Sequence, residues 1–431
     1  MTDKPTSKRE RSRRRRLWTG VAGVAMLAAP FAVIGSPAAS SASTAKVAKA
    51  SNGSTCGQNI GVPPDNVKGV YSTLPKSVQA TYGNWPFPLL PSAWAHFKGV
   101  KKKWTFGFIS FPIYTQWQID ILSQIKTEIA KLKSEGLATG KLLMNVAPTS
   151  AAATPAQQIS AIQQMVREGV SGIFLLPTSS TPLAPAITAA GKAGVPVALI
   201  DNVIGASQYA INVWSQNQAA AQNGVLKLIG GKGDVVNLTG PPGQPSDVAF
   251  NDSLLKAVAR CPNVHIIATL PGNWTTAGAE TAFQQFFASH PDAKLAAVLQ
   301  NGATMVGILE AYIAAGKTPP PIDDGGCGGG ELAWWWAHRS TYKTVGTCFN
   351  GFQTGYTVTK ALVRVLGGKG LKVNGIPVET PVVTNANLAQ WVNVGQALTS
   401  QVEPKGPLKS WGGEDSYLNQ YFNQPGTPGN L

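Results

Sequence analysis

The sequence has few of the residues on which catalytic and metal centres are usually built. Its four histidines (His96, His265, His290 and His338) show no metal-ligand spacing, and no GxSxG nucleophile motif occurs. The glycine-rich residues 325–330 lack both the Lys-Ser/Thr of a phosphate-binding loop and the GxGxxG spacing of a dinucleotide fold. We therefore expect no enzyme, no metal and no cofactor. A catalytic triad assembled from distant residues is the one enzymatic alternative that the sequence leaves open.

Acidic residues are also scarce, with 21 Asp and Glu against 36 Lys and Arg, which gives a net charge of +15 over 431 residues. The excess is partly local, because residues 1–42 alone carry a net charge of +6. The later basic residues are scattered apart from Lys101 to Lys103, and no basic stripe with interleaved aromatic residues is present. We expect no nucleic-acid partner.

Residues 1–42 have the layout of an export signal. A basic block precedes the apolar residues 17–35, and small residues at positions 40–42 offer a cleavage site. Ser12-Arg13-Arg14 resembles a twin-arginine signal, although an ordinary secretory signal fits as well. A permanent membrane anchor is the alternative, but Pro30 and Pro37 in a weakly hydrophobic stretch argue against it. We expect an exported protein on the periplasmic or extracellular side of the membrane.

The four cysteines form no CxxC pair, which excludes the common zinc and thioredoxin motifs. An even number of cysteines in an exported chain suits disulfide bonding. Cys327 and Cys348 are close in sequence and are the preferred disulfide, which would leave Cys56 and Cys261 as the remaining pair.

Residues 43–103 are rich in Pro, Gly and Ser, and contain an aromatic island at Tyr82, Trp85 and Phe87. They predict an irregular N-terminal extension that packs on the body of the protein. A regular alternation of strands and helices begins at Trp104, and the chain is long enough for more than one hydrophobic core.

Residues 157–202 show this alternation most clearly. A helical pattern leads to the apolar run 173–176, and a second helical pattern leads to the apolar run 195–200, which ends in Asp201-Asn202. Continuous apolar strands alternating with helices indicate a parallel sheet covered on both faces. Polar residues just beyond the carboxyl ends of such strands line the crevice in which open α/β sheets bind ligands. This segment predicts a small-molecule site.

The same rhythm restarts after Asn202, which indicates a second lobe of similar construction. The strands expected after Asn202 are residues 210–213, 234–238, 264–270 and 295–299, and the expected helices are residues 216–229, 247–259, 277–289 and 303–315.

Three motifs in this order resemble one family. They are Q-I-x-x-I-x-x-M-V-x-x-G-V-x-G-I ending in P-T-S-S, then A-G-V-P-V-x-x-I-D, then a strand ending in Gln300-Asn301 before a glycine-containing helix. Together they resemble the type I periplasmic substrate-binding proteins of ABC transporters, in the ribose-binding branch, over roughly residues 106–394. The resemblance implies an α/β fold of two Rossmann-like lobes with parallel sheets, joined by three hinge crossovers near Ser215, Phe349 and Val383.

The implied N-terminal lobe comprises residues 104–214 and 350–383. The implied C-terminal lobe comprises residues 215–349 and 384–400, and a tail follows at 401–431.

The resemblance also implies a set of ligand-binding residues. In this family aromatic rings stack on the C–H faces of a sugar, while carboxylates and amides bond its hydroxyls. By position, these residues are Tyr114, Trp117, Asp201, Asn202, Trp274, Asn301, Asp324 and Phe349. Structural roles are the alternatives: Asp201 and Asn301 could cap a turn or a helix, Trp274 could pack between the lobes, and Asp324 could satisfy the glycine-rich loop.

The sequence departs from the family at three positions where arginine or aspartate is usual. Asn202 follows the strand-end Asp, Ser-Asp-Val occupies residues 246–248, and Gln216 precedes Asn217. Recognition of neighbouring hydroxyls by an arginine fork is therefore diminished. A pentose becomes less suitable, and a less polar polyol, a deoxy or substituted sugar, or a cyclic metabolite remains open.

The function implied by the resemblance is non-catalytic binding for an ABC importer. The expected partners are a small ligand (a sugar, polyol or related metabolite) and the membrane permease subunits, with the protein itself a monomer. A ligand-sensing surface protein not coupled to transport is the alternative. A sugar-responsive repressor shares the fold but needs a helix-turn-helix headpiece, where this sequence has an export signal.

Overall fold

The computed structural model describes residues 55–61, 63–83, 85, 87–215, 218–302, 304–348, 350–378, 380–402, 404 and 415–426. The predicted export signal at residues 1–42, the hinge residue Phe349, and Gln216 with Asn217 lie outside these ranges. Among the residues described, no helix is both long and apolar enough to cross a membrane.

The first lobe is built on a six-stranded, fully parallel sheet in the order β10-β5-β4-β3-β1-β2. Its strands are β1 (Trp104–Ser110), β2 (Ala138–Val146), β3 (Gly172–Leu175), β4 (Val197–Ile200), β5 (Ala210–Ser215) and β10 (Gly375–Val378). The edge strand β10 comes from much later in the chain than β5, with which it pairs. A single lobe therefore contains segments that are distant in sequence.

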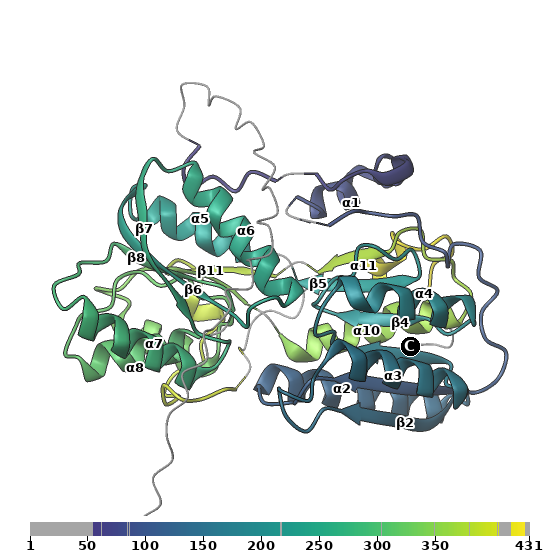
Figure 1. The fold of residues 1–431 in the computed structure, drawn as a ribbon. Helices are drawn as coiled ribbons and strands as arrows, with labels where there is room; N and C mark the ends of the chain where they lie inside the picture. The colour runs from purple at the N-terminus through teal and green to yellow at the C-terminus, as the bar shows by residue number, and fades with distance from the viewer. Residues whose placement is uncertain are drawn as a thin grey trace, which may run out of the picture. The chain divides into compact units, whose positions relative to one another are not determined.

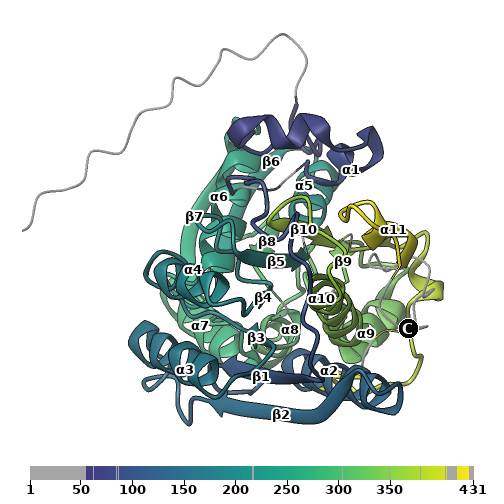
Figure 2. The same cartoon turned by 90° about the vertical axis from the view of Figure 1, so that its right-hand side faces the viewer.

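Helices cover both faces of this sheet, as the continuous apolar strands predict. They are α2 (Gln116–Ser134), α3 (Pro155–Arg167), α4 (Ala184–Lys192), which follows the short η2 (Thr181–Leu183), and α10 (Gly351–Leu366). One core cluster joins α2 and α10 to Phe106, Phe108 and Phe174, and another joins α3 and α4 to Ile109 and Ile173. The sheet thus lies between α2 with α10 and α3 with α4 (Figure 2).

The second lobe has a three-stranded parallel sheet in the order β7-β6-β8. Its strands are β6 (Lys232–Thr239), β7 (Asn263–Pro271) and β8 (Ala297–Gln300), and a separate antiparallel pair joins β9 (Val345–Thr347) to β11 (Val382–Thr384). The helices are α5 (Gln218–Leu228), α6 (Pro245–Ala259), α7 (Thr276–Ser289), α8 (Met305–Ala314) and α9 (Gly329–His338). Helices α5 and α6 cover one face of the sheet, and α7 and α8 cover the other (Figure 1).

The predicted α/β class with parallel sheets is confirmed. Helix α2 begins at Gln116, directly after its cap residue Thr115, whose side chain accepts a hydrogen bond from the backbone N–H of Gln118. The chain leaves the first sheet after Val378 and enters β11 at Val382. Val383, the predicted crossover, therefore lies within a strand of the second lobe, paired with Gly346.

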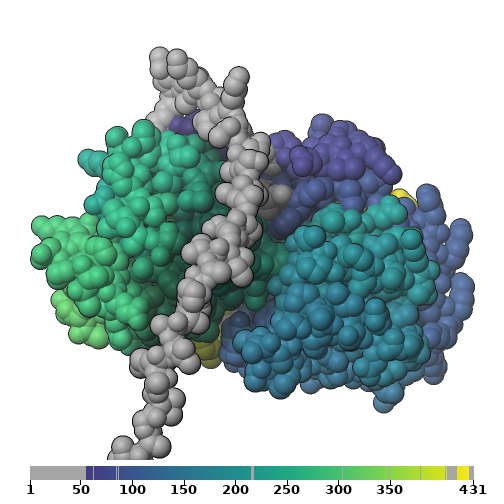
Figure 3. Space-filling model, viewed as in Figure 1, coloured from purple at the N-terminus to yellow at the C-terminus, as the bar shows by residue number. Residues whose placement is uncertain are grey.

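The N-terminal extension contacts both lobes and contains two short helices, η1 (Val67–Thr73) and α1 (Lys76–Thr81). The Tyr82 hydroxyl donates to the carbonyl of Gly375 over 2.6 Å, and Trp85 packs edge-on against Trp214 of the first lobe. The space-filling view shows the purple extension against the blue first lobe (Figure 3). Cys56 at its start is bonded to Cys261 of the second lobe.

The predicted disulfide Cys327–Cys348 is present, and the two remaining cysteines form a second disulfide, Cys56–Cys261. The first spans 21 residues and the second 205, so the entropy model assigns them roughly 3 and about 5 kcal/mol of stabilisation.

We expect the double variant Cys327→Ser/Cys348→Ser to lose roughly 3 kcal/mol in denaturant unfolding, and Cys56→Ser/Cys261→Ser to lose more. Equal stability of all three proteins would contradict this assignment.

Candidate functional site

A cavity of about 620 Å³ lies where the carboxyl ends of strands from both lobes meet. Its first-lobe walls are the loop after β1 with the start of α2, and the turn after β4. Its second-lobe walls are the start of α6, the loop after β7 and the loop that leads into α9. The principal lining side chains are Phe111, Tyr114, Gln116, Trp117, Asp201, Asn202, Ser246, Phe250, Trp274 and Glu331. This is the position in which parallel α/β sheets bind ligands.

The turn after β4 places Asp201 and Asn202 at the cavity and links the two lobes. Asp201 has φ +56°, a left-handed conformation that Asp and Asn tolerate better than other side chains. The buried Asn202 accepts a hydrogen bond through Oδ1 from the backbone N–H of Ser246 at 3.0 Å. The Ser246 hydroxyl donates to the carbonyl of Asp201 at 2.5 Å. Asn202, in the position where the family commonly has arginine, thus holds α6 of the second lobe.

Trp274 is oriented by a chain of buried hydrogen bonds behind the cavity. Its indole Nε1 donates to Asn301 Oδ1 at 3.1 Å, and Asn301 Nδ2 donates to Asp247 Oδ1 at 2.5 Å. Asp247 Oδ1 also accepts from the N–H of Gly240 at 2.7 Å, and these two bonds oppose the rise in its pKa that burial causes. Asn301 is 1% exposed and is not among the cavity-lining residues, so its contact is with Trp274 rather than with the cavity.

The indole of Trp274 also requires glycines beside it. A Cβ at Gly240 would lie 2.3 Å from the indole, and one at Gly302 would lie 2.6 Å from it. Only residues without a side chain allow this approach, and Gly302 additionally has φ +107°. The ring is thus held from two sides while it remains part of the cavity wall.

Aromatic side chains from both lobes face the cavity. Tyr114 is 43% exposed, and its backbone N–H donates to Gln118 Oε1, which fixes the loop at the start of α2. Trp117 is half-buried in the first turn of that helix. Phe250 of α6 stacks on Trp214 with ring centroids 5.9 Å apart. Flat apolar faces of this kind suit the C–H faces of a ring or polyol chain.

Asp324 does not have the position expected of a ligand-binding carboxylate. It is fully buried and is not among the residues that line the cavity. Its Oδ1 accepts from the backbone N–H groups of Gly326 and Cys327, both at 2.9 Å. An Asp before glycines commonly turns back onto its own loop in this way. The carboxylate therefore shapes the loop, and Gly326 and Cys327 of that loop face the cavity instead.

Glu331 is a cavity-lining carboxyl that the sequence analysis missed. Its Oε2 accepts from the N–H of Gly328 at 2.7 Å, and its Oε1 accepts from the N–H of Val306 at 3.2 Å. Burial, together with the nearby Asp324, raises the pKa of Glu331 to about 8. A pKa raised in this way favours the protonated form of Glu331 at neutral pH. The sequence signal that could have identified Glu331 is its place as the third residue of a helix that begins with glycines.

No Lys, Arg or His is found among the described residues that line the cavity. The described ranges also contain no cluster of three or more His, Cys, Asp or Glu able to hold a metal ion. Phe349, the remaining predicted site residue, lies outside the described residues. The further lining residues that the sequence analysis did not identify include Phe111, Gln116, Ser246, Phe250, Thr399, Gln401, Val402 and Pro404.

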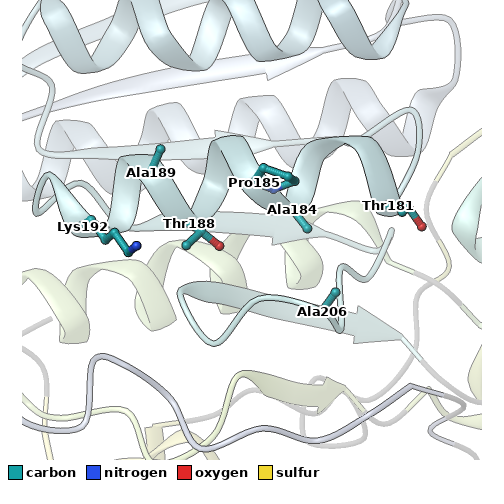
Figure 4. Close-up of a pocket in the computed structure, with 7 residues that line it drawn as sticks. All are labelled: Thr181, Ala184, Pro185, Thr188, Ala189, Lys192 and Ala206. Atoms are coloured by element: carbon teal, nitrogen blue, oxygen red, sulfur yellow. The ribbon is translucent and has the colours of Figure 1, made fainter.

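A second hollow, of about 440 Å³, lies beside α4 (Figure 4). It is lined mainly by small side chains, with Lys192 at one end and Thr188 near the middle. The Thr188 hydroxyl is hydrogen-bonded to Ser207 at 2.9 Å. None of the predicted ligand-binding residues lies in this hollow, so the interlobe cavity is the candidate site.

The raised pKa of Glu331 predicts that folding stability changes with pH. Between about pH 4.5 and 8 the folded protein holds a proton on Glu331 that the unfolded chain has released, so stability falls as pH rises. One extra bound proton corresponds to a slope of about 1.4 kcal/mol per pH unit. Glu331→Gln stays uncharged and should flatten the curve of unfolding free energy against pH.

The exposed Glu168 on the first lobe provides the matched control, because Glu168→Gln removes a carboxyl that lies in solvent. Chemical denaturation from pH 5 to 9 measures all three proteins. The same slope for wild type and Glu331→Gln would show that Glu331 is ionised in the folded state.

The comparisons with known proteins agree with this geometry. Residues 106–370 match the family described as periplasmic binding protein domain. The chain is 26% identical over 164 residues to the xylitol-binding protein of Mycolicibacterium smegmatis, covering 37% of this chain and 47% of that protein. It is 26% identical over 171 residues to a galactofuranose-binding protein of Escherichia coli, covering 38% and 54% respectively. The chain thus spans about half the length of the curated relatives it matches.

A crystal structure of an ABC transporter solute-binding protein from Thermobispora bispora has the same fold, with a TM-score of 0.59 and 23% identity. The superposition covers 67% of this chain and 87% of that one. At this identity the likeness concerns the fold alone. The family predicted from the sequence motifs is confirmed.

Proposed function

Because the chain belongs to the family of periplasmic binding protein domains, we propose that it captures a sugar, polyol or related small cyclic metabolite between its two lobes. The observation that carries this proposal is the cavity at the strand ends, with aromatic rings contributed by both lobes. A ligand stacked on rings from each side favours the closed arrangement, because it gains contacts with both lobes only there.

The chemistry of the cavity favours an uncharged ligand with both hydroxyls and an apolar face. Asp201 and Asn202 offer polar groups on one side, while Tyr114, Trp117 and Trp274 offer ring faces. An anionic ligand would find no cationic side chain among the described lining residues. The named relatives, which bind xylitol and galactofuranose, support a polyol or sugar.

Export, the monomeric state and delivery to an importer are proposed from family membership and from the sequence. The protein would be exported and would act as a monomer outside the cytoplasm, delivering ligand to the permease subunits of an ABC importer. The predicted signal at residues 1–42 supports export. The importer is supported by the family match.

Trp274 provides the test of the proposed binding site. A thermal-shift screen of neutral sugars, polyols and cyclitols should identify a stabilising ligand, because binding only to the folded state adds about 2.7 kcal/mol at a hundredfold excess over Kd. Loss of a stacking ring removes both buried area and the ring interaction. Trp274→Ala should therefore weaken that ligand roughly ten- to a hundredfold in calorimetric titration.

Trp336→Ala is the matched control. Trp336 stacks under Arg339 at 3.9 Å and does not line the cavity, so its loss should leave affinity unchanged. A screen in which no neutral ligand shifts the unfolding temperature would overturn the proposed function. Equal affinities of Trp274→Ala and wild type would move the site elsewhere.

A further inference from the structure

One wall of the cavity comes from a segment that follows β11, the last strand of the second lobe. Thr399, Gln401, Val402 and Pro404 all line the cavity, although the family match ends at residue 370. The sequence analysis placed residues 384–400 in the C-terminal lobe and residues from 401 onward in a tail, and it named no ligand-binding residue in either. We define residues 398–402 as the wall segment.

The wall segment is seated on the glycine-rich start of α9. The N–H of Gly329 donates to the carbonyl of Val402, and the N–H of Gly330 donates to the carbonyl of Ser400, both at 2.9 Å. These N–H groups belong to the first turn of the helix, which has no intrahelical partners for them. The segment therefore satisfies backbone donors that would otherwise be buried without acceptors.

Gly329 and Gly330 are also required because a side chain at either position would collide with the wall segment. A Cβ at Gly330 would lie 1.9 Å from the carbonyl oxygen of Leu398, and a Cβ at Gly329 would lie 2.8 Å from that of Val402. No side chain fits at such distances without displacing the segment. The run of glycines that carries no nucleotide motif thus has a structural purpose: it allows the wall segment to lie close to α9.

The wall segment is anchored to a different lobe at each side. On its N-terminal side, Trp391 is buried in the core of the second lobe, and Leu398, the first residue of the segment, packs against that core. After it, helix α11 (Asp415–Asn419) joins the first lobe through an ion pair of Arg364 with Asp415 at 2.7 Å.

Thr399 and Gln401 are exposed at the cavity, and neither makes a hydrogen bond to another side chain or backbone group in the described part of the chain. Their hydroxyl and amide can each donate and accept, which is what ligand hydroxyls require. The cavity also lacks arginine among its described lining residues. An uncharged amide and hydroxyl on this wall offer an alternative way to recognise hydroxyl groups.

We propose that the wall segment is part of the ligand site and that Thr399 and Gln401 are specificity-determining residues that bond ligand hydroxyls. This inference rests on the proposed function, since it concerns the same cavity. It assigns hydroxyl recognition partly to neutral groups on a segment that follows β11, the last strand of the second lobe. The site accordingly selects for hydroxyl pattern without requiring charge on the ligand.

The test compares the double variant Thr399→Val/Gln401→Ala with wild type and with Val394→Ala. Val394 is 69% exposed in the same part of the chain and does not line the cavity, so it is the matched control. The probes are xylitol and a panel of neutral pentoses, hexoses and cyclitols, with deoxy analogues of whichever compound binds. Calorimetric titration should show roughly tenfold weaker binding for the double variant and unchanged binding for Val394→Ala, since two neutral hydrogen bonds are lost.

The preference for a hydroxylated ligand over its deoxy analogue shows whether Thr399 and Gln401 contact the ligand directly or only support the structure of the site. If Thr399 and Gln401 bond ligand hydroxyls, the double variant should lose part of the preference of wild type for the hydroxylated ligand over one of its deoxy analogues. A second variant, Gly330→Ala, displaces the wall segment while leaving its side chains intact, and it should also weaken binding. Circular dichroism with thermal unfolding confirms that each variant is folded.

The outcomes distinguish this inference from the proposed function. If wild type binds a member of the panel and the double variant binds it equally tightly and with the same preference over deoxy analogues, the inference is wrong while the proposed function stands. If wild type binds none of the probes, the proposed function is overturned, and the inference with it.

Discussion

The structure depends on one constraint: parallel strands present all their carboxyl ends at the same edge of a sheet. In both lobes the loops at this edge face a single cavity, so residues far apart in sequence converge there. The constraint also explains where unusual backbone conformations occur. Asp201 after β4 and Trp274 after β7 both have positive φ, because each strand must turn sharply at the cavity. The cost of these turns is offset by hydrogen bonds to Ser246 and Asn301.

The two lobes are not independent pieces of chain. The core of the first lobe includes Trp85 from the N-terminal extension and Tyr421 from the C-terminal helix region, together with Phe250 from α6 of the second lobe. The Cys56–Cys261 disulfide adds a covalent link from the extension to the second lobe. Segments that precede and follow the α/β repeats therefore complete the structure around the cavity, and residues 398–402 form part of its wall.

Much of the fold could be predicted because its signals are local. Apolar runs separated by helical patterns identified strands β3 to β8, whereas the edge strand β10 was not predicted. The residues just after β1, β4 and β7 (Tyr114, Trp117, Asp201, Asn202 and Trp274) line the cavity. Asn301 and Asp324 were found at the predicted loops but face other protein groups. Glu331, Phe250 and Gln401 were not predicted, since no local pattern shows which distant segment reaches a given strand end.

The sequence by itself determined the α/β class and the strand ends at which a ligand site could form, and it favoured one of the two disulfides. These follow from periodicity and spacing, which act over a few residues. Only the tertiary structure decided which polar side chains face the cavity. A buried carboxylate or amide must find hydrogen-bond partners, and the nearest backbone N–H groups compete with a ligand for it. The carboxylate of Asp324 accepts hydrogen bonds from the backbone N–H groups of Gly326 and Cys327. Asn301 is hydrogen-bonded to Trp274 and Asp247, whereas the ring of Trp274 remains at the cavity.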